Sequence, residues 1–91
     1  VGSLEGTLSD DIGNGVVGAT LRAVDGEDRI LAETSSGVDG VYRFEALPEG
    51  EVSIVALPPL NDEHGWMPVE VRSDVRRRET TKGVHLRFER P

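Results

Sequence analysis

The chain has 91 residues, a formal net charge of −7 and no cysteine. This length suits one domain, residues 1–91. In a domain this small, most of the secondary-structure elements must contribute side chains to one common core. The lack of cysteine excludes disulfides, thiolate metal sites and cysteine nucleophiles. The acidic balance argues against nucleic-acid binding, which needs a basic surface.

No segment approaches the roughly 18 consecutive apolar residues of a membrane span, so we expect no direct membrane insertion. The first residues, Val1-Gly2-Ser3, lack the basic start and the apolar run of a signal peptide. We interpret the chain as a mature or excised domain, for which a missing leader carries no information about export.

Short stretches in which apolar and polar residues alternate predict β-strands along the whole chain. In chain order, the predicted strands are Ser3–Leu8, Val17–Val24, Arg29–Thr34, Val41–Ala46, Val52–Ala56, Met67–Arg72 and Gly83–Glu89. Turn residues separate them, including Asp-Gly pairs at 25–26 and 39–40 and the Pro-Glu-Gly run at 48–50. We expect an irregular loop at Leu60–Trp66 and a polar, charged segment at Asp74–Lys82.

The alternation also predicts which residues face a common core. Those expected to point inward are Leu4, Gly6, Leu8, Ala19, Leu21, Ala23, Tyr42, Phe44, Ala46, Val52, Ile54, Ala56, Val69, Val71, Val84, Leu86 and Phe88. Seven short strands at a spacing of about 8–12 residues favour an all-β fold, a seven-stranded antiparallel β-sandwich.

Three segments carry a more specific pattern: Ser3–Leu8, Ile12–Leu21 and Thr34–Gly50. Together they resemble the carboxypeptidase regulatory-like domain and the related Cna protein B-type domains of bacterial surface proteins. The resemblance covers residues 3–57 and implies a prealbumin-like (transthyretin-like, Ig-like) Greek-key sandwich. Cna B-type domains often carry an internal Lys–Asn amide bond, but the only lysine here is Lys82 and the predicted last strand has no asparagine. We therefore do not expect that crosslink.

The residues of this pattern have structural explanations. Gly6 faces inward, which lets the first strand approach a neighbour closely, and Gly18 marks a bend or bulge at the start of the second strand. Leu47 closes the end of the core, and Pro48 pre-sets the turn that follows. The whole structural motif comprises Gly6, Gly18, Asp39, Gly40, Tyr42, Phe44, Leu47, Pro48 and Gly50.

Candidates for partner contact lie outside this pattern. His64 and Trp66 fall in the loop after Pro58-Pro59, and Trp66 suits either stacking on a sugar or capping the open end of the sandwich. His64 and His85 together would suggest a metal site or an acid–base pair. However, His85 is expected on the outer face of the last strand, so two exposed histidines are the alternative.

Charged clusters add two candidates. Arg76, Arg77 and Arg78 form a basic run that suits a phosphate or an acidic partner, or else a solvated loop. Two oxygen-rich turns, at residues 10–14 and 25–28, offer the ligand chemistry of calcium without the spacing of an EF-hand, and solvated turns are the alternative. We expect no cofactor, with calcium as the alternative.

These observations favour a non-catalytic module of a larger secreted or cell-surface protein. It would act as a spacer or accessory domain whose partners are neighbouring domains, in an extracellular, cell-surface or periplasmic location. The alternative is a carbohydrate- or peptide-binding module with a glycan or protein partner. A small enzyme built on His64 and His85 is the least supported reading.

Overall fold

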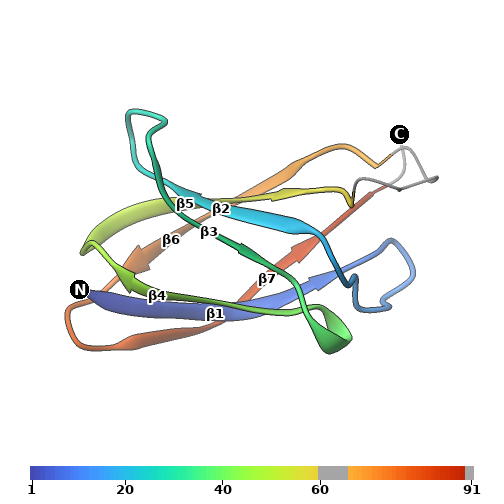
Figure 1. The fold of residues 1–91 in the computed structure, drawn as a ribbon, viewed down its shortest axis with the longest axis horizontal. Coiled ribbons are helices and arrows are strands. Elements are labelled where there is room, and N and C mark those ends of the chain that lie inside the picture. The colour runs from blue at the N-terminus through green and yellow to red at the C-terminus, as the bar shows by residue number, and fades with distance from the viewer. Residues whose placement is uncertain (60–65, 90–91) are drawn as a thin grey trace.

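A computed structural model describes residues 1–59 and 66–89, which form seven strands in two sheets (Figure 1). The elements are β1 (Gly2–Ser9), β2 (Thr20–Val24), β3 (Ile30–Ser35), the 3-10 turn η1 (Val38–Gly40), β4 (Val41–Leu47), β5 (Gly50–Leu57), β6 (Val69–Val75) and β7 (Thr80–Arg87). The predicted all-β fold with seven strands is confirmed. In the described residues, no helix is long and apolar enough to cross a membrane.

The two sheets have the strand orders β4-β1-β7 and β3-β2-β5-β6. The pairs β1–β4, β2–β3, β2–β5 and β5–β6 are antiparallel, as expected, but β1 and β7 run parallel. The prediction of a wholly antiparallel sandwich is therefore wrong at this pair. The reason is topological: the first and last strands become neighbours without a connecting turn, so hairpin geometry does not set their relative direction.

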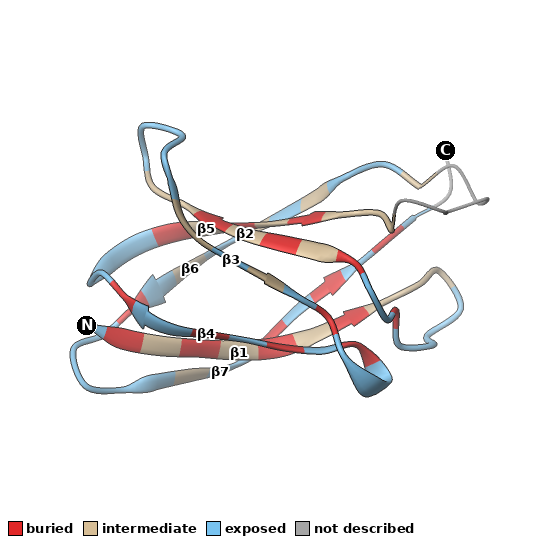
Figure 2. Cartoon of the chain, viewed as in Figure 1, coloured by how far each residue is buried: buried red, intermediate tan, exposed pale blue. Residues whose placement is uncertain are grey.

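The core lies between the two sheets and buries one face of β1, β2, β4 and β5 and of the second half of β7, whereas β3 is only half-buried or exposed (Figure 2). β1 alternates buried and half-buried residues along its whole length, and Leu4 and Leu8 are inaccessible to solvent. Tyr42, Phe44 and Phe88 are the largest fully buried side chains. The rest of the core is aliphatic and consists of Val16, Ala19, Leu21, Ala23, Leu47, Val52, Ile54, Ala56, Val75, Val84 and Leu86.

The predicted boundaries are wrong at three strands. β2 begins at Thr20 rather than Val17, because the backbone turns at Gly18 (φ +81°) before the strand starts. β6 runs three residues further than expected, to Val75, and β7 begins at Thr80. The segment expected to be merely polar and charged therefore holds the end of one strand, a tight turn and the start of the next.

Ala46 was expected to face the core, but it is exposed and has a φ of +57°. Gly2 pairs with Leu47 and Leu4 pairs with Phe44, so β4 holds one residue more than β1 between these pairs. Such a β-bulge reverses the alternation beyond it. As a result, Leu47 rather than Ala46 fills the core.

A second bulge lies in β7. Leu4 pairs with Thr81 and Gly6 with Val84, so Lys82 and Gly83 together oppose a single residue of β1. Gly83 adopts a φ of +74°, which costs a glycine little because it has no Cβ. The register also shifts in β3, where Leu31 has no partner between the pairs Ala23–Ala32 and Val24–Ile30.

Candidate functional site

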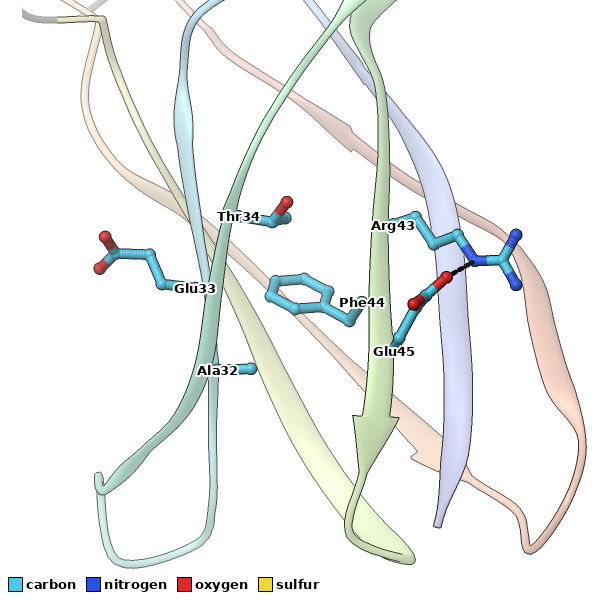
Figure 3. Close-up of a pocket in the computed structure, with 6 residues that line it drawn as sticks. All are labelled: Ala32, Glu33, Thr34, Arg43, Phe44 and Glu45. Atoms are coloured by element: carbon cyan, nitrogen blue, oxygen red, sulfur yellow. Dashed lines mark ion pairs between the residues drawn. The ribbon is translucent and has the colours of Figure 1, made fainter.

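A cleft separates β3 and β4, which are the edge strands of opposite sheets on the same side of the sandwich. Its volume is about 310 Å³. The residues that line it are Ala32, Glu33, Thr34, Arg43, Phe44 and Glu45 (Figure 3). The Phe44 ring extends from β4 toward β3, whereas Arg43 and Glu45 extend away from the cleft on the other side of β4.

The charged residues around this cleft are engaged with one another. Arg43 Nε lies 3.3 Å from a Glu45 carboxylate oxygen, and Glu33 pairs with Arg22 at 2.7 Å. Phe44 is the buried base of the cleft, and the surface above it consists of small side chains and the backbone edges of two strands. Its chemistry suits contact with an extended peptide segment, because strand edges offer unpaired N–H and C=O groups.

Trp66 stacks on Phe88 at the end of the sandwich. The ring centroids are 5.2 Å apart and the rings are inclined by only 7°. Phe88 is fully buried, and Trp66 is half-buried and packs against the core. The sequence allowed two roles for Trp66, stacking on a sugar or capping the sandwich. The packing favours the cap, because Phe88 occupies one face of the indole. His64 lies outside the described residues.

Arg76, Arg77 and Arg78 form the tight turn between β6 and β7, and all three are exposed. The backbone of the turn docks on the start of β1, because Arg78 N donates to Val1 O at 2.9 Å. The Arg77 guanidinium lies 3.9 Å from a Glu49 carboxylate oxygen. The turn is therefore held by its backbone and presents its guanidinium groups to solvent.

The two oxygen-rich turns use their first carboxylate to close the turn. Asp10 Oδ1 accepts hydrogen bonds from the backbone N–H groups of Ile12 and Asn14 at 3.0 and 2.8 Å. Asp25 Oδ1 accepts from Glu27 and Arg29 in the same way, at 2.8 and 3.0 Å. The N–H groups of Arg29 and Glu27 hold the pKa of Asp25 below its ordinary value. Among the described residues, no group of three or more His, Asp or Glu side chains could hold a metal ion.

His85 is exposed on the outer face of β7, as predicted, and its Nδ1 lies 2.5 Å from Thr7 Oγ1. The two residues are register partners in the parallel pair. Sequence analysis missed this contact, because 78 positions separate the residues and only the parallel pairing brings them together. The pair lies on an open sheet face with Val41 and Gly83 beside it.

No protein-family model matches the chain. The chain is similar to Colossin-A of Dictyostelium discoideum, with 41% identity over 69 residues. The matched region is 76% of this chain but 1% of Colossin-A. Among solved structures, the fold is similar to the Bacillus anthracis TIE protein, with a TM-score of 0.73 and 20% identity. That match covers 99% of this chain and 16% of the TIE chain.

At 20% identity, the likeness to the TIE protein concerns the fold alone, and it supports the β-sandwich seen here. In both comparisons the chain corresponds to a small part of a much longer protein. The two similar proteins come from different organisms, Dictyostelium discoideum and Bacillus anthracis.

Proposed function

We propose that this chain is a non-catalytic module of a larger secreted or cell-surface protein, in which it holds neighbouring domains apart. The observation that carries this proposal is the parallel pairing of β1 with β7. Parallel neighbours start at the same end, so the start of the first strand and the end of the last lie at opposite ends of the sandwich (Figure 1). A chain that enters at one end and leaves at the other acts as a spacer along the 38 Å long axis.

The comparisons support the modular part of this proposal. A match confined to 1% of Colossin-A and 16% of the TIE chain is expected for one module among many. At the finer level, we propose the prealbumin-like Greek key of carboxypeptidase regulatory-like and Cna B-type domains. Three parts of the sequence pattern support this assignment. Gly6 lies where β1 and β7 approach closely, Asp39-Gly40 lies in the turn η1 before β4, and Leu47 is buried in the core just before Pro48.

The mass of the native polypeptide tests the proposal. An antibody against the 91-residue domain should detect a much larger protein in the source organism, in the secreted or surface fraction. The control is the isolated domain of 9.9 kDa, run on the same blot. A native product that co-migrates with the isolated domain would refute the modular function.

The cleft between β3 and β4 favours a second function, the binding of an extended peptide strand. Its base is the Phe44 ring and its walls are two strand edges. Amide NMR shifts during a screen of extended peptides should concentrate on residues 32–34 and 43–45. A Thr34→Arg variant that blocks the cleft should abolish them, while Thr80→Arg on the opposite edge serves as the matched control. Shifts spread evenly over both edges would contradict a peptide site here.

A glycan version of this second function predicts a response from Trp66. Because Trp66 is the only tryptophan in the chain, its fluorescence reports on this site alone. Saturable changes during a glycan screen would support binding at the exposed part of the indole. Unchanged Trp66 fluorescence across the screen would refute glycan binding at this residue.

A further inference from the structure

The parallel pair formed by β1 and β7 extends over the full length of both strands. Its register runs from Ser3–Thr80 to Ser9–Arg87. Backbone hydrogen bonds continue it at both ends: Ser3 N donates to Glu79 O and Phe88 N donates to Ser9 O, each at 2.9 Å. One more bond, from Arg78 N to Val1 O, precedes the first of these. The first and last segments of the chain are thus joined directly, along a ladder that the bulge at Lys82 and Gly83 interrupts once.

We infer that this ladder is a shear clamp, and that the module resists tension applied through its two ends. Force that pulls the start of β1 and the end of β7 in opposite directions acts along the strands. The ladder bonds lie across the strands, so they share the load and must rupture together. In an antiparallel terminal pair, the same force would open the bonds one after another from one end. This inference rests on the proposed function, which supplies the neighbours that transmit the load.

The load path leaves most of the sandwich unstressed. β2, β3, β4, β5 and β6 all lie between β1 and β7 in the sequence, so tension passes from β1 to β7 without crossing them. β2, β3, β5 and β6 come under tension only after the clamp ruptures. The chain then extends to about 3.5 Å per residue, which for 91 residues is about 320 Å. Subtracting the folded length of 38 Å leaves about 280 Å of released chain.

A side-chain contact reinforces the clamp from within. Tyr42 on β4 donates from its hydroxyl to Val84 O on β7, at 2.6 Å, although β1 lies between these two strands. The contact requires Gly6 on β1, because a Cβ at that position would lie 2.9 Å from Tyr42 Oη and 1.7 Å from Val84 O. Burial raises the pKa of Tyr42 above its ordinary value, so the hydroxyl keeps its proton as a donor. β7, an edge strand, is thereby tied to both other strands of its sheet.

Single-molecule force spectroscopy on the 91-residue chain tests the clamp through two pulling directions. In the first, handles at the two ends of the chain load the ladder in shear. In the second, the handles are at the C-terminal end and at a cysteine introduced as Ile12→Cys. Ile12 is 73% exposed in the loop after β1, and the chain has no other cysteine. This second geometry peels β7 from β1 starting at the Ser9–Phe88 bond.

We expect the mean unfolding force at a given loading rate to be several-fold higher in the shear geometry, with an extension of about 280 Å. Equal forces in the two geometries would overturn the inference. The result does not depend on the parent protein. A short native polypeptide would refute the modular function without changing the difference in unfolding force between the two geometries. Equal unfolding forces in the two geometries would refute the clamp without affecting the modular function.

A pair of variants separates the clamp from general stability. Tyr42→Phe removes the hydroxyl bond to β7, and Ile54→Val removes one methyl group from a buried side chain on β5, which lies outside the load path. Urea denaturation measures the equilibrium stability of each variant. We expect Tyr42→Phe to lower the shear force more than Ile54→Val does per unit of lost stability. Equal reductions per unit of lost stability would mean that rupture is not set by the clamp and would overturn the inference.

Discussion

Replacing Gly6 with alanine should disrupt the sheet that contains both ends of the chain. The added Cβ would lie 1.7 Å from Val84 O and 2.6 Å from Val84 C, both of which are backbone atoms. Moving the oxygen to the 3.0 Å minimum seen for real Cβ contacts requires a displacement of 3.0 − 1.7 = 1.3 Å. Because β7 is held along its length by β1, this displacement cannot be confined to one atom.

The cost follows from what that displacement breaks. It removes the bond from Tyr42 to Val84 and weakens the adjacent ladder bonds, at about 1 kcal/mol each. Forcing an extra carbon into a packed interior adds about 1–3 kcal/mol. We therefore expect Gly6→Ala to lower the free energy of unfolding by about 3–5 kcal/mol. A domain of this size has a total of about 5–14 kcal/mol, so the variant should lose a large part of its stability.

Urea denaturation followed by the fluorescence of Trp66 gives the measurement, with circular dichroism as a second probe. Gly26→Ala is the matched control, because a Cβ at Gly26 meets no atom within 4 Å and its φ is not in the left-handed region. The control should change stability by less than about 0.5 kcal/mol. If Gly6→Ala denatures at the same urea concentration as Gly26→Ala, the close approach of β1 and β7 is wrong.

Three further variants test other parts of the structure. Tyr42→Phe should cost about 1 kcal/mol in urea denaturation, because the buried Val84 carbonyl loses a donor; no loss would contradict the bond across β1. Asp25→Asn should lower stability at neutral pH and have no effect at strongly acidic pH. The folded pKa of Asp25 is lowered, so its contribution is present above the unfolded pKa and disappears as pH falls through the folded pKa; a difference that persists in acid would refute this. Trp66→Ala should cost about 2 kcal/mol through loss of the Phe88 stack, measured by circular dichroism, and an unchanged midpoint would refute the capping role.

The alternation of apolar and polar residues predicted the interior where strands are regular. Leu4 and Leu8 on β1, and Val52, Ile54 and Ala56 on β5, are all buried as expected. Period-two patterns report directly which face of a strand is buried. They fail where the backbone itself departs from period two, as at Ala46, where the extra residue in β4 moves Leu47 into the core.

Pairing was harder to predict than burial. The parallel direction of β1 and β7 depends on packing between residues that are as many as 78 positions apart, and no local signal encodes it. The Tyr42–Val84 bond and the Thr7–His85 contact both depend on that pairing. For the same reason, Gly6 was identified as a point of close approach, but the strand that it approaches was not. The predicted contact residues Arg76, Arg77 and Arg78 are exposed on the turn between β6 and β7.

The irregular edges of the two sheets bear on how copies of this module would behave if the parent protein carried them in tandem. Within the described residues, the edge strands are β3, β4, β6 and β7, and the register shifts in three of them, β3, β4 and β7. The fourth, β6, is regular but carries exposed charges at Glu70, Arg72 and Asp74. On the side opposite the cleft, the bulge of β7 and the charges of β6 deny an incoming strand a flat, uniform template. Tethered copies at high local concentration are prone to exchanging strands, and these edges would keep each copy folded on itself.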